Sequence, residues 1–321
     1  MIILIIGIDN HFQLKVVEVM KKRYIALLIS LLLLLVACSN DNNTTTENNT
    51  DNSEETITYE SENGPVEVPA NPERVIVLST FGGNVLALDT PLVGVDSWSK
   101  GNPNYDLDGV EAVSDENLEK IIELKPDLII GLSSIKNVDK LKEIAPTVTF
   151  TYGQLDYLEQ HLEIGKLLNK EKEAQQWIDD FKARASDLGN QIKEEIGEDA
   201  TVTVIENFDK ELYVFGDNWA RGTEILYQEM NLPMPEKVEE TALADGYATL
   251  SLEVLPEYVG DYLIVSKNED SSSSFTETDT FKNIPAVKNG NVFIADATKF
   301  YFNDPITLDY QLDFFEENFL P

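Results

Sequence analysis

The residue types most often used for metal and nucleophilic chemistry are scarce in this sequence. It contains two histidines, His11 and His161, and one cysteine, Cys38. A disulfide within one chain is therefore excluded, and a zinc site made of several His and Cys ligands is nearly so. A Ser-His-Asp hydrolase would depend on His161, and the chain has no Gly-x-Ser-x-Gly turn to carry the serine. Hydrolysis by two carboxylates stays open, with Asp304 as one candidate.

Two glutamates occupy equivalent places in an internal repeat. The residues Leu, Glu, Glu and Asp of the stretch 118–127 recur at an offset of 134, which puts Glu119 in register with Glu253. Each copy predicts a short helix that begins at an acidic residue and leads into a buried strand. The two acids either favour the positive ends of their helices or bind two basic points on a symmetric partner. The spacing alone leaves both interpretations open.

The composition narrows the class of protein. The chain has 321 residues, with 24 Lys and Arg against 58 Asp and Glu, and a formal net charge of −34. This length predicts about two domains, and 42% hydrophobic residues are enough to form buried cores. The acidity argues against a nucleic acid partner, because phosphate binding depends on clustered Lys and Arg.

The N-terminal region, residues 1–37, predicts an export signal whose true start is Met20. A basic start at residues 21–23 precedes an apolar run at 25–37, and these thirteen residues at about 1.5 Å each are too short for a membrane core of about 30 Å. A charged start, a short apolar run and a small final residue are typical of a secretory signal. The motif Leu35-Val36-Ala37-Cys38 then resembles a bacterial lipobox, which implies acylation of Cys38. An ordinary signal peptide with an incidental cysteine is the alternative.

The rest of the sequence predicts a tether and two α/β lobes. Residues 38–56 contain the lipidated Cys38 and a run of Asn, Thr, Asp, Glu and Ser that has too little apolar surface to fold. Short β-rich runs alternate with helical patterns in an N-terminal lobe, 57–155, and again in a C-terminal lobe, 199–321. Between them, residues 156–198 have helical periodicity, which predicts one long helix or two in series. Bends or breaks are expected at Gly165, Asn169 and Gly189.

Unbroken apolar runs locate the strands of both lobes. The expected strands are residues 74–78, 92–95, 128–130, 147–150, 202–205, 213–215, 262–265 and 291–294, and the expected terminal helix is 311–319. Residues 81–84, Phe-Gly-Gly-Asn, lack the spacing of a phosphate-binding loop and predict a turn that opens a helix toward a cleft. His161 lies among apolar residues at helical spacing, which favours a half-exposed helix histidine over a metal or heme ligand.

Together these parts resemble a class III substrate-binding protein of an iron-siderophore ABC importer. The resemblance runs from residues 68–75 (Val-Pro-Ala-Asn-Pro-Glu-Arg-Val) to the end, and includes 117–121 (Asn-Leu-Glu-Lys-Ile), 124–128 (Leu-Lys-Pro-Asp-Leu) and 252–253 (Leu-Glu). It implies an α/β fold with two Rossmann-like lobes joined by one long α-helix. It also implies that Glu119 and Glu253 meet arginines on two permease subunits that work with a cytoplasmic ATPase.

Within that family, the chain is most similar to Gram-positive ferric-hydroxamate-binding lipoproteins. The similarity lies in residues 213–228 (Tyr-Val-Phe-Gly-Asp-Asn-Trp-Ala-Arg-Gly-Thr-Glu-Ile-Leu-Tyr-Gln), 151–157 and 301–305. It implies that six residues line the pocket: Trp98, Tyr152, Tyr213, Trp219, Arg221 and Tyr301. Aromatic rings would cover the linkers of a ferric trihydroxamate, and Arg221 would donate to its chelating oxygens. Iron would need no protein ligand, so no cofactor is expected.

This resemblance implies a lipid-anchored binding protein on the outer face of the cytoplasmic membrane of a Gram-positive bacterium, without enzymatic activity. Four alternatives remain, one of which is a structural adhesin. A catecholate siderophore complex is strongly anionic and calls for several bases, of which Arg221 is the candidate. Heme wants an axial ligand, for which Tyr213 or Tyr301 is available. A surface-anchored carboxylate hydrolase belongs to another class, and the abundance of acids makes its signal unspecific.

Overall fold

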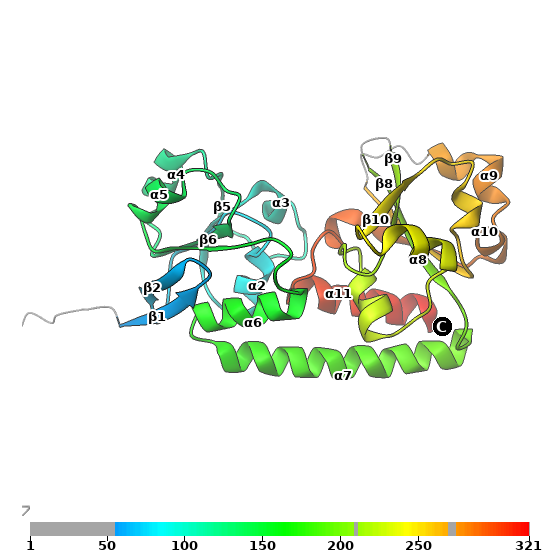
Figure 1. Ribbon diagram of the computed structural model, residues 1–321, viewed down its shortest axis with the longest axis horizontal. Coiled ribbons are helices and arrows are strands. Elements are labelled where there is room, and N and C mark those ends of the chain that lie inside the picture. Colours follow the sequence, from blue (N-terminus) through cyan, green and yellow to red (C-terminus); the bar gives the residue numbers. More distant parts are fainter. Residues whose placement is uncertain (1–54, 209–210, 269–273, 321) are drawn as a thin grey trace, which may run out of the picture. The chain divides into compact units, whose positions relative to one another are not determined.

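The computed structural model describes residues 55–208, 211–268 and 274–320. The expected signal, Met20 and the lipidation site Cys38 lie outside these residues. The described part contains two five-stranded sheets with helices packed around them, and a separate two-stranded hairpin (Figure 1). In the hairpin, β1 (Thr56–Ser61) pairs antiparallel with β2 (Gly64–Pro69). The α/β class with two lobes is confirmed.

The N-terminal lobe is built on a parallel sheet of order β5-β4-β3-β6-β7. Its strands are β3 (Val75–Val77), β4 (Leu92–Val95), β5 (Glu111–Ala112), β6 (Leu128–Leu132) and β7 (Thr147–Phe150). Its helices are α2 (Gly82–Ala87), α3 (Ser97–Lys100), α4 (Leu118–Leu124) and α5 (Val138–Lys142). The apolar runs of β3, β6 and β7 are almost wholly buried, as expected for strands covered on both faces. All four strands predicted for this lobe are confirmed.

The C-terminal lobe has a mixed sheet of order β10-β9-β8-β11-β12. Its strands are β8 (Val202–Phe208), β9 (Glu211–Phe215), β10 (Tyr247–Leu250), β11 (Tyr262–Lys267) and β12 (Val292–Asp296). Strands β8, β11 and β12 are parallel, whereas β9 and β10 run antiparallel to their neighbours. Only two residues separate Phe208 from Glu211, and so short a connection can join only antiparallel strands.

Shorter elements and a terminal helix complete the C-terminal lobe. They are the π-helix η2 (Glu224–Glu229), α8 (Glu236–Ala242), η3 (Leu255–Glu257), η4 (Ser274–Glu277), α9 (Asp279–Lys282), α10 (Pro285–Asn289), η5 (Ala297–Lys299) and α11 (Pro305–Phe319). Helix α11 begins six residues before the predicted terminal helix, because Asp304 caps it and Pro305 fits its first turn.

Two helices in series connect the lobes: α6 (Tyr157–Leu167) and the 26-residue α7 (Glu171–Ile196). Helix α6 starts at a capping box in which Asp156 and Glu159 bond to each other's backbone. The predicted break at Asn169 is confirmed, since its φ of 58° ends α6. The prediction was wrong for Gly165 and Gly189, which lie inside the helices. They permit close packing instead: a Cβ on Gly189 would lie 2.7 Å from Cα of Met230.

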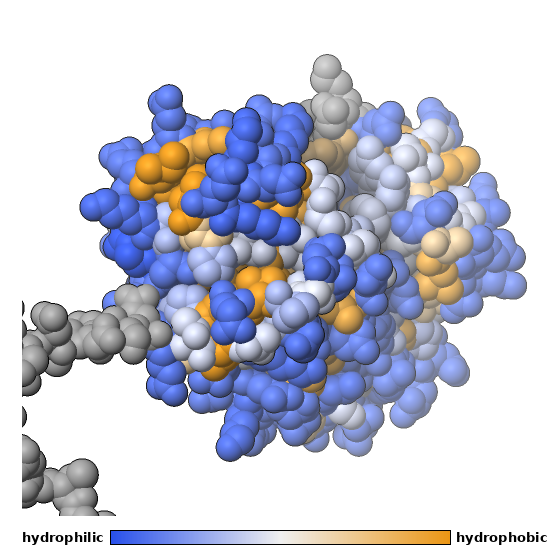
Figure 2. Space-filling view, turned by 60° about the vertical axis from the view of Figure 1, so that its left-hand side comes forward, coloured by the Kyte–Doolittle hydropathy of each residue, from blue (hydrophilic) through white to orange (hydrophobic). Residues whose placement is uncertain are grey.

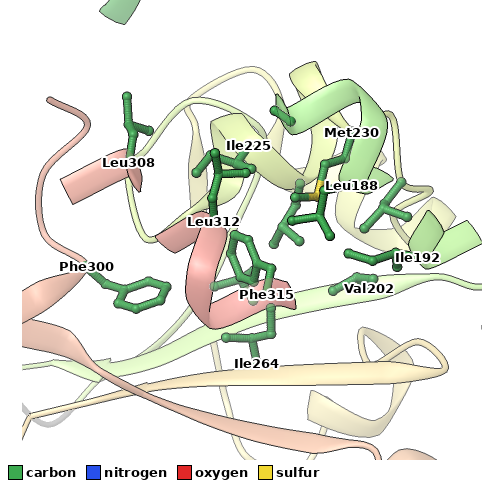
Figure 3. Packing of buried hydrophobic residues seen from close by; sticks show 14 of the residues in the cluster. Leu188, Ile192, Val202, Ile225, Met230, Ile264, Phe300, Leu308, Leu312 and Phe315 are labelled. Carbon is green, nitrogen blue, oxygen red and sulfur yellow. The ribbon is translucent and has the colours of Figure 1, made fainter. Parts of the chain in front are cut away.

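Helix α7 contributes to the cores of both lobes. Its Ala174 packs in the N-terminal core with β3, β6 and α6, whereas Phe181, Leu188 and Ile192 belong to the C-terminal core. Figure 3 shows this second core, where side chains from α7, β8, η2, β11 and α11 gather in one apolar cluster. A helix anchored in two cores in this way holds the lobes at a defined separation.

The surface is mostly hydrophilic, and Figure 2 shows hydrophobic residues in a few separate patches on one face. The large hydrophobic side chains that remain most exposed are Trp98, Ile122, Tyr152, Phe208, Leu243 and Ile294. Three of these are aromatic, including two of the predicted pocket residues. Within the described residues, none of the helices combines the length and the apolar character that crossing a membrane requires.

Candidate functional site

A cavity of about 610 Å³ lies between the two lobes. On the N-terminal side its wall comes from residues that follow β3, β6 and β7, which is the carboxyl edge of the parallel sheet where α/β proteins bind ligands. Its lining residues are Thr80, Phe81, Asn84, Leu132, Tyr152–Tyr157, Gln160, Asp217–Trp219, Glu224, Gln228, Ala244, Asp245 and Asn303. Phe81 and Asn84 open α2 toward this cavity, as predicted for residues 81–84.

Two of the six predicted pocket residues, Tyr152 and Trp219, lie in the cavity wall. The ring of Trp219 packs against Tyr247 with centroids 4.8 Å apart, and Tyr247 in turn contacts Tyr213 at 5.8 Å. Tyr213 therefore supports the wall from behind. Tyr152 is 71% exposed, so its ring is available to cover an apolar surface of a ligand.

The other three predicted residues form a second aromatic group outside the wall. Trp98 contacts Tyr301 with centroids 5.1 Å apart, and the Arg221 guanidinium lies 4.9 Å from the centre of the Tyr301 ring. The guanidinium also lies 5.1 Å from the centre of the Phe215 ring. Burial raises the pKa of the Tyr152 hydroxyl, Glu224 raises it further, and Arg221 lowers it. Arg221 therefore links this group electrostatically to the cavity.

Arg221 is held by a buried carboxylate that the sequence did not predict. Its Nε donates to Oε2 of Glu206 at 2.7 Å, and Nη1 donates to the carbonyl of Trp219 at 3.3 Å. Glu206 is fully buried. Burial, and next the Glu206 carboxylate, raise the pKa of Tyr301 to about 12. In the described part of the chain, Nη2 makes no hydrogen bond, so this nitrogen is the one Arg221 can offer to a ligand.

The backbone around Arg221 is strained. Ala220 and Arg221 have φ values of 56° and 57°, and Gly222 follows at 81°. Two consecutive left-handed residues other than glycine are rare and persist where surrounding contacts enforce them. At Gly222 a Cβ would lie 2.5 Å from the Phe315 ring, so glycine is required there. A π-helix, a form enriched at functional sites, follows directly.

Glu224, the first residue of this π-helix, enforces the strained turn. Its Oε1 accepts from the Ala220 backbone N–H at 2.9 Å and from Nδ2 of Asn303 at 3.2 Å, and Oε2 accepts from the Thr223 hydroxyl. Burial raises the pKa of Glu224. The only sequence signal for Glu206 was its position directly after the predicted strand 202–205, and Glu224 had no such signal.

His161 is a correction to the sequence analysis, which expected it to be half-exposed. It is 1% exposed, lies against Trp177 with ring centroids 5.3 Å apart, and its Nδ1 is 3.1 Å from Oδ1 of Asn84. Burial lowers its pKa to about 4, so it is neutral at pH 7. The described residues contain no group of three His, Cys, Asp or Glu side chains able to hold a metal ion.

Asp304, the carboxylate suggested for hydrolysis, is fully occupied by structural bonds. It caps α11 through the backbone N–H groups of Ile306 and Thr307, and accepts from the hydroxyls of Tyr105 and Thr307. It is buried and does not line the cavity. Burial raises its pKa. A hydrolytic pair built on Asp304 therefore has no structural support.

The two repeated glutamates are exposed and lie outside the cavity wall, one on each lobe. Glu119 lies in the first turn of α4, as predicted. The prediction of a helix beginning at Glu253 was wrong, because a turn there precedes η3, a 3-10 helix with Pro256 in its first turn. Hydrogen bonds from its own backbone N–H and from Ser251 lower the pKa of Glu253.

Comparison with known proteins gives concordant matches. Residues 83–298 match the model of the family described as periplasmic binding protein. The iron(3+)-hydroxamate-binding protein FhuD of Bacillus subtilis (strain 168) is 36% identical over 273 residues, which are 82% of this chain and 86% of the relative. The iron(3+)-hydroxamate-binding protein YxeB of the same strain is 38% identical over 267 residues, 80% of this chain and 83% of the relative.

Solved structures agree with these relatives. FhuD2 from Staphylococcus aureus with bound ferrioxamine B superposes with a TM-score of 0.74 at 33% identity, covering 78% of this chain and 98% of that one. The FhuD protein from S. pseudintermedius gives a TM-score of 0.74 at 34% identity, with 83% of this chain and 98% of that one covered.

Proposed function

Since the chain belongs to the periplasmic binding protein family, we propose that it captures ferric hydroxamate siderophores and delivers them to an ABC permease for iron uptake. Relatives named as iron(3+)-hydroxamate-binding proteins, and a structural neighbour with bound ferrioxamine B, support this assignment. In this function the protein makes and breaks no bond. Its work consists of closing around the ligand and docking to the permease.

The composition of the cavity wall carries the proposal. Among its described residues there is no Lys, Arg or His, whereas six carboxamides face the cavity: Asn84, Gln154, Gln160, Asn218, Gln228 and Asn303. Three hydroxamates balance the charge of one ferric ion, so the chelate core is neutral and needs donors rather than cations. Amides supply such donors, and the rings of Tyr152 and Trp219 can cover the apolar linkers.

The same wall disfavours the other iron chelates. A ferric tris-catecholate is strongly anionic, and four carboxylates, Asp156, Asp217, Glu224 and Asp245, would repel it. Heme would need an axial ligand, and the two tyrosines that the sequence suggested, Tyr213 and Tyr301, do not line the cavity, which leaves Tyr152 as the exposed tyrosine that the wall offers. We propose that the ferric ion is cargo, coordinated by the siderophore and by no protein side chain.

Docking and anchoring complete the proposal. Exposed Glu119 and Glu253, one on each lobe, would meet arginines on the two permease subunits. Acylation of Cys38 would hold the protein on the outer face of the cytoplasmic membrane. Exchanging both glutamates for Gln is expected to abolish siderophore-dependent iron uptake by cells while leaving the affinity of the purified protein unchanged. Unimpaired uptake by the double variant would contradict the docking role.

A fluorescence titration tests the ligand assignment. The chain contains three tryptophans, and Trp219 lies in the cavity wall, so a bound ferric complex should quench its emission. The full chain in detergent micelles is titrated with ferrioxamine B, a ferric tris-catecholate and heme. Saturable one-to-one quenching by ferrioxamine B, absent in Trp219→Phe at that wavelength, supports the proposal. Saturation by the catecholate or heme instead would overturn it.

A further inference from the structure

The N-terminal wall of the cavity contains two amides whose donors are unused. Asn84 on α2 is 5% exposed, and in the described part of the chain its Nδ2 makes no hydrogen bond. Gln160 on α6 also lines the cavity, and its buried Nε2 has no hydrogen-bond partner among the described residues. A buried donor without a partner is costly, so such groups usually have a role in binding.

Two of the three amides of the C-terminal wall already donate to protein groups. Asn303 donates its Nδ2 to Glu224, and Gln228 donates its Nε2 to the carbonyl of Asp217 at 2.5 Å. These donors are engaged in holding the strained turn and its surroundings. The donors available to a ligand oxygen therefore come from the N-terminal side, from the exposed Asn218, and from Nη2 of Arg221, which lies outside the wall.

His161 determines how Asn84 is oriented. The Asn84 oxygen can only accept, so Nδ1 of His161 must carry the hydrogen in their 3.1 Å contact. The other ring nitrogen, Nε2, is buried and has no partner in the described part of the chain. The histidine ring therefore makes its single hydrogen bond to Asn84. With the oxygen of Asn84 turned to His161, its two N–H groups point away from the histidine.

We propose that Asn84 and Gln160 form a donor pair that hydrogen-bonds the iron-coordinating oxygens of the ligand, with His161 as the positioning residue for Asn84. The inference rests on the proposed function and deepens it, because it assigns ligand contacts to a lobe for which sequence analysis named only Trp98 and Tyr152. It also gives the role of the buried histidine: preorganisation, which keeps the donor in its binding orientation before the ligand arrives.

Substitutions at Asn84 test the donor role. Ferrioxamine B is titrated against the full chain, its Asn84→Leu and Gln160→Leu variants, and Asn84→Asp, which keeps the oxygen bonded to His161 but cannot donate. Each Leu variant is expected to raise Kd about three- to tenfold, and Asn84→Asp at least as much. Gln191→Leu is the control, since Gln191 is an exposed amide on α7 outside the cavity wall, and its Kd should stay within about twofold. Unchanged binding by both Asn84 variants would overturn the proposal.

A double-mutant cycle tests the positioning role. His161→Leu should weaken binding about as much as Asn84→Leu, and the combination should be no weaker than Asn84→Leu alone, because the histidine acts through the asparagine. His161→Gln, which retains a donor, should keep most of the affinity. Losses that add in the double variant would show that His161 acts elsewhere and would refute this role.

The outcomes separate this inference from the proposed function. If the unmodified chain fails to bind ferrioxamine B, the proposed function itself fails. If it binds and the Asn84, Gln160 and His161 variants bind equally well, the function stands and the donor pair is wrong. Far-ultraviolet circular dichroism and thermal melting of every variant confirm that the fold is intact, with Asn84→Asp as the variant that disturbs packing least.

Discussion

In the N-terminal lobe β3, β6 and β7 lie side by side and parallel, and in the C-terminal lobe β8, β11 and β12 repeat this arrangement. Strands β6 and β11 begin at Leu128 and Tyr262, which are related by the same offset of 134 as the two glutamates. The preceding residues also match: Asp127 accepts from the backbone N–H of Arg74 at 3.0 Å, and Asp261 accepts from that of Thr201 at 2.9 Å. The internal repeat is therefore a structural repeat.

The two lobes differ in the strands that complete each sheet. The N-terminal lobe adds β4 and β5 in parallel, whereas the C-terminal lobe adds the antiparallel β9 and β10. Trp219 follows β9, and the strained turn that contains Arg221 comes directly after Trp219. The shared strands thus provide the framework of each lobe, and most proposed ligand contacts of the C-terminal lobe depend on the part that has no counterpart in the other.

The largest effect is expected from the Arg221–Glu206 pair, since the described N-terminal lobe has no ion pair so deeply buried. Arg221→Met leaves the Glu206 carboxylate buried without a partner, which should lower the free energy of unfolding by about 3–5 kcal/mol. Urea denaturation at pH 7 measures this loss. Binding of ferrioxamine B should also weaken, because Nη2 is removed.

Two further variants isolate the cause. Adding Glu206→Gln to Arg221→Met should restore most of the stability but not the binding. Arg184→Met breaks the exposed pair with Asp309, with side chains 50% and 43% exposed, and should change stability by only about 0–1 kcal/mol. Equal losses of unfolding free energy for Arg184→Met and Arg221→Met would show that burial does not increase the contribution of the ion pair to stability.

The second prediction concerns His161, which supports the N-terminal wall. Its native pKa of about 4 lies below the usual 6.5, so between these pH values the unfolded chain binds more protons than the folded one. Stability should therefore fall as pH drops from 6.5 toward 4, by up to about 3 kcal/mol. His161→Gln should lack this component when both proteins are unfolded with urea at each pH.

The comparison with His161→Gln removes the opposing contributions of other groups. Burial raises the pKa values of Glu224 and Asp304, and such groups stabilise the fold as pH falls. They are present in both proteins, so the difference between the two curves reports His161. Parallel curves would mean that the histidine is solvated and does not preorganise the N-terminal wall.

The sequence predicted the framework well because the framework depends on local pattern. Strands β4 and β7 begin and end where unbroken apolar runs predicted them. The burial of His161 escaped prediction because its partner Asn84 is 77 residues away along the chain. The same holds for the burial of Glu206, whose carboxylate accepts a hydrogen bond from Arg221, 15 residues further along the chain. Contacts between distant segments leave no periodic signal.

The third prediction tests the equivalence of the shared strands. Asp127→Ala leaves two backbone N–H groups without their acceptor, and Asp261→Ala leaves the backbone N–H and the hydroxyl of Thr201 without theirs. Each should lower the free energy of unfolding by about 1–2 kcal/mol. Neither should change the affinity for ferrioxamine B, because neither residue lines the cavity. Thermal unfolding with parallel titrations measures both quantities. If one variant lost affinity while the other did not, the two lobes would not use this contact in the same way.

The smallest effect concerns the charge of the ligand and the end of the antiparallel β9–β10 pair. Tyr247 pairs with Phe215, and Gly216 donates to the carbonyl of Gly246. Asp217 and Asp245, the next residues of these two adjacent segments, both line the cavity. Neither carboxylate has an ion pair within the described residues. Acetylating the terminal ammonium of ferrioxamine B removes its positive charge but keeps the chelate. Affinity should then fall about threefold at low salt, an effect that Asp217→Asn should reduce and that high salt should screen.

The exposed Asp139→Asn, on α5, should bind both ligands as the unmodified chain does. Equal affinities for the two ligands would mean that the acidic end of the β9–β10 pair does not contact the ligand, and would confine recognition to the amides, the rings and Arg221.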